Sequence, residues 1–476
     1  MAVDTKHPDH EAMEDRWVKM RDVVAGQERI HDKGKRYLPE LSGQSPREYR
    51  AYRDRTPFYN ATKRTIDGLS GMIFRREPDV DRPDAMEAFF EDVTLDGLDH
   101  QAFAENCVEE VLEVGRGGIL VDHPRTEGRT ITRAQAEAEA VRPFFNLYKS
   151  ESILGWRVGQ VGNITTLTQL RLKEWIEEPD GEFDTESIAQ IRVLDLVQGE
   201  SGPQYRVRLY REQIVDGKKQ WVQHGDEVFP LMRGQPIPYI PFVFFNTQDT
   251  RPDVVLPPLL DLANTNLAHY RVTADLFHGA HFTGLPTAVI TGHNRDEEEG
   301  PLRIGSQEAW ILGEESAKAY YLEFEGSGLG SLENLLNRLE HQMAFLGARM
   351  LAPEKKAAEA ADTARIKQQG ESSVLASMSM AVSGALTKAC EIARDWMGLS
   401  GEISYELNHD FDPTGLSAQE LQALVMSWQQ GAIGFETLFE NLKRGEIVRS
   451  DKSAEEEREE IDMDPSLGNL GRDEHA

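Results

Sequence analysis

Apolar residues recur at helical spacing through most of the first 118 residues. Ser45, Pro46 and Glu48 form a capping box with proline at the first helical position, which predicts a helix start there. Residues 58–74 place one set of side chains on a single helical face: Phe58, Thr62, Ile66, Leu69 and Ile73. We therefore expect a mainly helical N-terminal region.

Glycines end this region after two shorter expected helices, at residues 84–90 and 103–114. Gly115, Gly117 and Gly118 interrupt the helical pattern and release a strand at residues 119–121. A phosphate-binding loop would instead lead into a helix and carry a Lys followed by Ser or Thr, and neither feature is present. These glycines therefore predict a helix stop.

From residue 143 to residue 248 the apolar period changes to two. Residues 191–197 and 205–210 are rich in branched and aromatic side chains, as strands are. Turn signals occur at residues 178–181 and 216–217. The pattern predicts an antiparallel meander that packs on the N-terminal helices.

A long helix is expected at residues 257–282, where Pro257 and Pro258 provide a start signal. Polar residues are spread around this helix rather than along one side, namely Asn264, Asn266, His269, Arg271 and His278. Its neighbours should therefore include polar surfaces as well as an apolar core.

A strand-rich insertion follows, with strands expected at residues 287–291, 309–312 and 319–324. A second long helix then spans residues 331–351 and carries one predicted apolar stripe: Leu332, Leu335, Leu336, Leu339, Met343, Leu346 and Met350. Paired long helices form a shaft, so the insertion between them should project beyond it.

A third helix is expected from about Thr363 to Met397. Small residues line it and would allow close helix approach, namely Ala381, Ala385, Ala389 and Ala393. A strand at residues 403–407 and a helical region opened by Ser417 and Glu420 follow. The charged tail after residue 453 should be a solvated helix and a frayed end. The predicted fold class is α+β.

Composition limits the functions open to the chain. Its 476 residues suggest about two to four lobes. The 82 acidic and 52 basic side chains give a formal charge of -30, which opposes sequence-independent attraction to DNA phosphates. Gripping nucleic acid is therefore not expected, although an acidic wall could still let DNA slide past it.

Cys107 and Cys390 are the two cysteines, far apart and both in helical patterns. We expect buried free thiols. Residues 1–10 are polar, and the longest apolar run, residues 239–245, contains a proline and is too short to span a bilayer. The expectation is a cytosolic, reducing place of synthesis.

His278 and His281 lie three residues apart in the first long helix and could share a metal with Asp275. A metal-dependent hydrolase that uses this helix is thus one alternative. Hydrogen bonds between helices are the more common use of such histidines, and no nucleophile-elbow pattern accompanies them. We expect no catalytic residues, no metal and no cofactor.

Lys355 and Lys356 follow the second long helix in a stretch of small and charged residues. On a monomer they would form an ordinary solvated pair. If copies form a ring with this segment facing inward, the pair becomes a belt of positive charge in an acidic bore. Arg365 and Lys367 could extend that belt.

Four segments resemble one family of tailed-bacteriophage portal proteins. The order of long helix, strand-bearing insertion, long helix, charged loop and further helix also resembles the core of those proteins. The segments are YLPELSGQ (37–44), FYNATKRTIDGLSGMIFR (58–75), LANTNLAHYRVTADLFHGAHFTGLPTAVITG (262–292) and ARIKQQGESSVL (364–375). The likeness covers residues 17–446, although no segment is a chemical signature.

This resemblance implies a portal-like architecture, carried over by position. Residues 1–256 would form a wing, helical to residue 118 and β-rich over residues 119–250. Two stem helices, at 257–283 and 326–352, would bracket a small α/β or β clip at 284–325. A tunnel loop at 353–363, a long helix and strand at 364–410, and a short crown with an acidic tail at 411–476 would follow.

The resemblance also implies a ring of about twelve copies at one capsid vertex, a passive channel through which double-stranded DNA is packaged and ejected. The implied partners are the terminase large subunit, head-completion or adaptor proteins, and the major capsid or scaffolding protein, with no membrane. Its place would be the virion, after assembly in the host cytoplasm.

The candidate DNA-contacting residues are Lys355, Lys356, Arg365 and Lys367, and the candidate docking residues of the clip are Arg295, Glu297, Glu298 and Arg303. Another virion head-tail connector component is a further alternative, although adaptors are usually much shorter.

Overall fold

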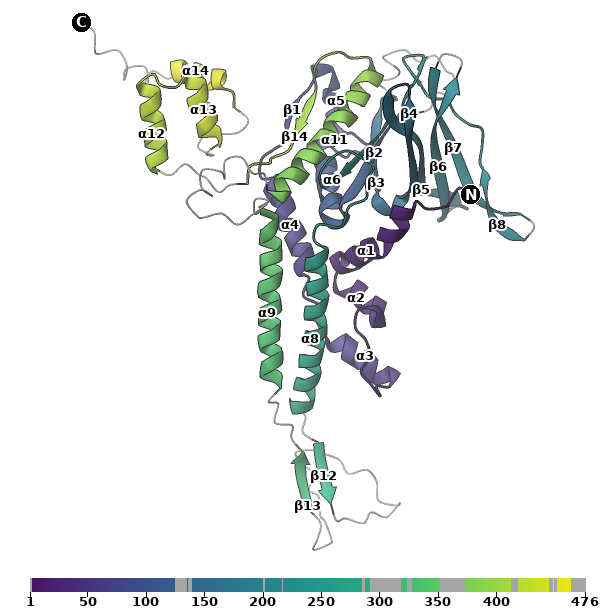
Figure 1. Cartoon of the computed structure of the whole chain (residues 1–476), viewed down its shortest axis with the longest axis vertical. Helices are drawn as coiled ribbons and strands as arrows, with labels where there is room; N and C mark the ends of the chain where they lie inside the picture. The colour runs from purple at the N-terminus through teal and green to yellow at the C-terminus, as the bar shows by residue number, and fades with distance from the viewer. Residues whose placement is uncertain are drawn as a thin grey trace.

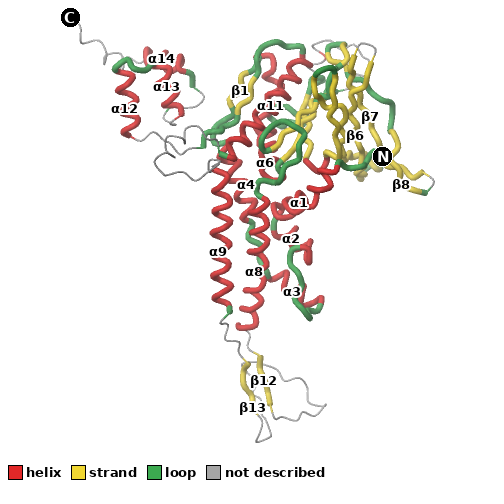
Figure 2. Tube along the Cα trace, viewed as in Figure 1, coloured by secondary structure: helices red, strands yellow, loops and turns green. Residues whose placement is uncertain are grey.

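The computed structural model has a broad body of helices and sheets from which two long helices extend, with a strand pair beyond their far end (Figure 1). The α+β class expected from the sequence is confirmed, since helices and antiparallel sheets together make up the body (Figure 2). The structure describes residues 2–124, 135, 139–199, 202–215, 217–284, 287–291, 318–322, 328–351, 373–411, 418–444, 448 and 452–463.

The N-terminal region is helical, as predicted. Its elements are α1 (Pro8–Ala25), α2 (Gln27–Lys33), η1 (Gly34–Arg36), α3 (Pro46–Arg55), α4 (Ala61–Ile73), η2 (Asp84–Met86), α5 (Glu87–Glu91) and α6 (His100–Val114). The capping box of Ser45 and Glu48 is formed at the start of α3. The predicted stripe that includes Ile66, Leu69 and Ile73 is buried.

Gly115 ends α6 in a left-handed conformation with φ 87° and leads into β2 (Arg116–Asp122), which is longer than the strand predicted. β2 lies between β11 (Phe242–Asn246) and β3 (Phe144–Lys149). A Cβ on Gly118 would lie 2.1 Å from the ring of Phe242. Gly118 therefore serves close aromatic packing within the sheet, whereas Gly115 ends the helix as predicted.

The predicted meander is a five-stranded antiparallel sheet in sequence order: β4 (Ile153–Val161), β5 (Ile164–Asp180), β6 (Asp184–Gly199), β7 (Gly202–Val215) and β8 (Lys218–Gln223). A small pair, β9 (Leu231–Met232) and β10 (Gln235–Pro236), follows. The turn predicted at residues 178–181 is displaced, because Pro179 still pairs with Thr185. Since β4 ends its pairing at Leu172, no neighbour on that side needs the missing N–H of Pro179.

The two long helices are α8 (Leu260–Gly284) and α9 (Leu329–Ala348), the latter followed by η4 (Arg349–Leu351). Helix α8 begins after the proline pair rather than at it. Two of the three strands predicted between the helices are β12 (Thr287–Thr291) and β13 (Lys318–Leu322). The third, at residues 309–312, lies outside the described residues.

Helix α11 (Val374–Met397) covers the later part of the predicted third helix, whose expected start at Thr363 lies outside the described residues. The side chain of Ser373 accepts a hydrogen bond from the Ala376 N–H and caps the helix. Its alanine stripe is buried, and Cys107 and Cys390 are buried free thiols, as expected. β14 (Ser404–Glu406) pairs with β1 (Asp79–Asp81), a strand that the sequence pattern did not predict.

Three further helices follow: α12 (Ala418–Gln429), α13 (Phe435–Arg444) and α14 (Ala454–Met463). They lie together, apart from the rest of the body (Figure 1). Leu438 and Phe439 supply their buried apolar contacts. The predicted cap residue Ser417 is outside the described residues. Among the helices that the structure describes, none is long and apolar enough to cross a membrane.

Candidate assembly surface on the paired helices

Polar side chains fix α8 to the N-terminal helices. Asn266 is fully buried, and its Oδ1 accepts hydrogen bonds from the backbone N–H and the hydroxyl of Thr62 at 3.1 and 3.0 Å. Lys19 of α1 donates to Asn264 at 3.0 Å, and Nε of Arg271 donates to the backbone oxygen of Tyr37 at 2.8 Å. The expectation that α8 has polar neighbours is confirmed.

Helix α9 packs along α8 through most of its predicted apolar stripe. Met343 and Met350 are buried, and Leu346 packs against the core. One polar contact crosses the pair: Nε2 of His269 lies 3.3 Å from Oε1 of Glu340. The two helices therefore form one antiparallel pair that extends from the body (Figure 1).

Leu335 corrects the predicted stripe. It is 40% exposed, whereas its neighbour Leu336 is half-buried. Successive helical residues are separated by about 100° around the axis, so the two cannot both face α8. Leu335 instead belongs to a second, exposed stripe on α9, made of Leu335, Arg338, Gln342 and Phe345.

Phe345 is the most exposed large apolar side chain of this second stripe, at 69%. Its members follow one another at three, four and three residues, which is a helical repeat. The helical repeat of these four residues is visible in the sequence, but the predicted apolar stripe includes Leu335 and leaves out Phe345. We call this set the outer face of α9.

Beyond the ends of the paired helices, β12 and β13 form an antiparallel pair with Thr287 opposite Leu322 and Thr291 opposite Lys318. In the part of the chain that the structure describes, each of these strands pairs only with the other. The hairpin thus projects away from the body, as the sequence predicted for the insertion (Figure 1).

Of the two histidines proposed as a metal site, His278 contacts α3. The hydroxyl of Tyr52 donates to Oδ1 of Asp275 at 2.8 Å, and the Tyr52 ring packs edge-on against His278, with centroids 5.2 Å apart. Burial, with the nearby charge of Arg55, lowers the pKa of His278. Across the described residues, no group of three or more His, Cys, Asp or Glu side chains could hold a metal ion.

All eight residues proposed from the sequence as contact sites lie outside the described residues. They are Lys355, Lys356, Arg365 and Lys367 for DNA, and Arg295, Glu297, Glu298 and Arg303 for docking at the clip. Their roles stay predictions. The structure does describe the flanking helices, namely α8 and α9 around the docking residues and α9 and α11 around the DNA-contact residues.

Comparisons with known proteins give limited similarity. A family model described as "Domain of unknown function (DUF4055)" matches residues 258–397, which include α8, α9 and α11. A search of curated proteins found no significant match.

Several solved structures match over most of their length. One, titled "Neck of empty GTA particle computed with C6 symmetry", has a TM-score of 0.37 and 14% identity and covers 79% of this chain and 87% of that chain. "Virion of native gene transfer agent (GTA) particle" has a TM-score of 0.36 and 14% identity, covering 87% and 96%. "Neck of native GTA particle computed with C12 symmetry" has a TM-score of 0.36 and 13% identity, covering 83% and 91%. Similarity at this level does not by itself assign a function.

Proposed function

We propose that the chain is the subunit of a portal-type ring, a component that connects the head and tail of a phage-like particle and forms its DNA channel. The outer face of α9 carries this proposal. α9 has Met343 as its one buried residue, and Leu335 and Phe345 are exposed on a face of the helix that α8 does not cover. A helix that exposes two large apolar side chains on one face calls for a second packing partner.

The extended shape of the described chain supports assembly (Figure 1). The paired helices α8 and α9 and the β12–β13 pair extend from the body, which leaves part of their surfaces uncovered in a single copy (Figure 1). Burial between copies would cover these surfaces.

The two sides of the helix pair differ, which suits a ring. α9 lies along one side of α8, and α1, α2 and α3 lie on the other (Figure 1). In a ring built from head-to-tail contacts, one surface of each copy meets a different surface of the next. We therefore place the outer face of α9 against the α1–α3 side of the adjacent copy.

The proposed mechanism is passive. The resemblance to portal proteins in residues 58–75 and 262–292 supports a channel of about twelve copies in the virion, assembled in the host cytoplasm, with DNA transport driven by a separate motor. The β12–β13 hairpin belongs to the part proposed to dock the terminase large subunit and head-completion proteins. The net charge of -30 suits a bore past which DNA slides.

Lys355 and Lys356 are proposed to touch DNA in passing. The double variant Lys355→Glu with Lys356→Glu should impair packaging or DNA retention and leave rings intact. Normal packaging by that variant would remove the assignment.

The ring interface is tested by adding charge to the outer face of α9. The double variant Leu335→Glu with Phe345→Glu should prevent ring formation and leave the fold of the monomer intact, measured by electron microscopy and circular dichroism. Phe183→Glu with Ile214→Glu is the matched control, because Phe183 in the turn between β5 and β6 and Ile214 on β7 are both exposed, away from α9. Rings in both variants, or in neither, would contradict the proposed interface.

A further inference from the structure

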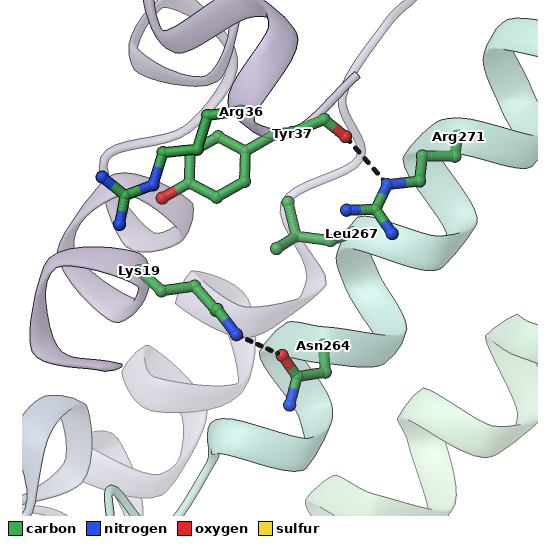
Figure 3. A pocket seen from close by; sticks show the side chains of 6 residues that line it. All are labelled: Lys19, Arg36, Tyr37, Asn264, Leu267 and Arg271. Atoms are coloured by element: carbon green, nitrogen blue, oxygen red, sulfur yellow. Dashed lines mark hydrogen bonds between the residues drawn. The ribbon is translucent and has the colours of Figure 1, made fainter. Parts of the chain in front are cut away.

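A cavity of about 350 Å³ lies between α1, η1 and α8 (Figure 3). Its lining combines side chains from three separate segments, namely Lys19, Arg36, Tyr37, Asn264, Leu267 and Arg271. Three of the six carry positive charge, and no carboxylate is among them. This is unusual in a chain with 82 acidic and 52 basic residues.

The cationic groups of this cavity retain unused hydrogen-bond donors. Nε of Arg271 donates to the backbone oxygen of Tyr37 at 2.8 Å, which fixes the guanidinium, and its two Nη groups have no hydrogen-bond partner among the described residues (Figure 3). Nζ of Lys19 donates to Asn264 at 3.0 Å and has two further N–H groups.

Arg36 is only weakly neutralised. Its Nη2 lies 3.5 Å from Oδ1 of Asp15, whose side chain is almost fully exposed. An exposed ion pair at this distance contributes little and is screened by salt. The guanidinium of Arg36 also lies 5.7 Å from the ring centroid of Tyr37. The cavity therefore keeps an excess of positive charge.

We propose that this cavity binds an oxyanion, either a carboxylate or a phosphate group. The Nη pair of Arg271 is a planar fork that matches two oxygens of such a group, and Lys19 adds a compact charge beside it. Leu267 and the Tyr37 ring supply an apolar wall for the body that carries the anion. A volume of about 350 Å³ is at the small end of ligand sites, which span about 300–1,000 Å³.

The size and the concave shape of the cavity bear on the source of the anion. The cavity suits a free phosphate or the acidic side chains of a peptide, whereas a double helix presents its phosphates on a convex surface. The bound anion would join α1, η1 and α8, so binding would stabilise the attachment of α8 to the body. This inference stands without the ring, because every residue involved belongs to one copy.

Thermal unfolding of the full-length protein tests the site. Inorganic phosphate and a hexaglutamate peptide are titrated separately at constant ionic strength, with chloride and hexaglutamine as references. We expect a saturable rise in Tm with at least one of the two probes. A rise with phosphate alone identifies a free phosphate-type ligand, and a rise with the peptide identifies carboxylates.

Variants show whether the cavity is responsible. Arg271→Gln combined with Lys19→Gln should weaken the response at least about tenfold, because a hydrogen bond to a charged group contributes that much. Arg36→Gln is a milder variant that keeps the contacts of Arg271 and Lys19. Arg50→Gln is the matched control, since Arg50 is exposed on α3 and does not line the cavity. No saturable response to either probe, or an equal response in the cavity variants and the control, would overturn the proposal.

Discussion

Asn266 of α8 and Thr62 of α4 are joined by two hydrogen bonds to one oxygen atom. Oδ1 of Asn266 accepts from the Thr62 N–H at 3.1 Å and from its hydroxyl at 3.0 Å. Nδ2 of the same amide donates to the backbone oxygen of Tyr59 at 2.7 Å. Because the N–H groups in the first turn of a helix lack partners inside it, Asn266 completes the start of α4 and fixes the direction of α8.

Asn266→Ala should therefore destabilise the protein strongly. The change leaves the N–H and hydroxyl of Thr62 and the carbonyl of Tyr59 without partners, at a cost of about 2–4 kcal/mol in the free energy of unfolding. Urea denaturation followed by tryptophan fluorescence measures this. Asn337→Ala on the exposed surface of α9 is the control, and equal stability of the two variants would disprove the role of Asn266.

The sequence predicted the elements whose signals are local. The capping box at Ser45, the buried stripe of α4, the helix stop at Gly115 and the antiparallel meander are all present. Each depends on neighbours within a few turns of helix or along one hairpin, so periodicity and turn chemistry are sufficient to identify it.

Long-range relationships were not predictable in this way. β1 pairs with β14, which lies more than 300 residues away in the sequence. A strand of three residues is too short to show a recognisable alternation of apolar and polar side chains. Leu335 was placed on the wrong stripe because Leu335 and Leu336 are adjacent and only the position of α8 distinguishes them. The cationic cavity combines side chains from three segments of the chain, so no local sequence pattern predicts it.

Arg116 provides a second prediction, because it is fully buried. Its guanidinium carbon lies 4.1 Å from the ring centroid of Trp156 and 4.9 Å from that of Phe244. Among the described residues, none of its side-chain nitrogens has a hydrogen-bond partner. Burial lowers its pKa to about 9.

Arg116→Met should be at least as stable as the parent protein, since it removes a desolvated charge and fills the same space. Arg116→Ala should lose about 2–4 kcal/mol, because it leaves a cavity between the two aromatic rings. The Tm of each variant gives the comparison. An equal loss in both would mean that the charge itself stabilises the fold.

Glu110 predicts a dependence of stability on pH. Arg21 contacts Glu110, Glu113 and Glu151 at 2.7, 2.6 and 2.9 Å, so one guanidinium faces three carboxylates. Burial raises the pKa of Glu110 from 4.5 to about 7, although Arg21 opposes the shift. Burial lowers the pKa of Arg21, but the three carboxylates outweigh it and raise that pKa.

A carboxyl group with a raised pKa stabilises the folded state below its unfolded pKa, and this contribution is lost as the pH rises through the folded value. Glu110→Gln should therefore gain stability relative to the parent between pH 4.5 and about pH 7. Gln keeps an oxygen acceptor for the Ser150 N–H. Tm measured in parallel for both proteins tests this, and a difference that stays constant with pH would contradict it.

The β12–β13 hairpin should be separable from the body. Within the described residues its strands pair only with each other, so replacing residues 287–322 with a short Gly-Ser linker should change the stability of the body by no more than about 0.5 kcal/mol. Rings should still form, while binding of docking partners at that end is lost. Failure of this variant to form rings would show that the hairpin belongs to the ring interface.

The most direct test of the account is the mass of the purified protein under native conditions. Native mass spectrometry over a range of protein concentrations should show one closed assembly near twelve times the subunit mass of 53.7 kDa. The Leu335→Glu and Phe345→Glu variant should appear as monomers in the same experiment. A parent protein that stays monomeric at every concentration would contradict the proposed ring.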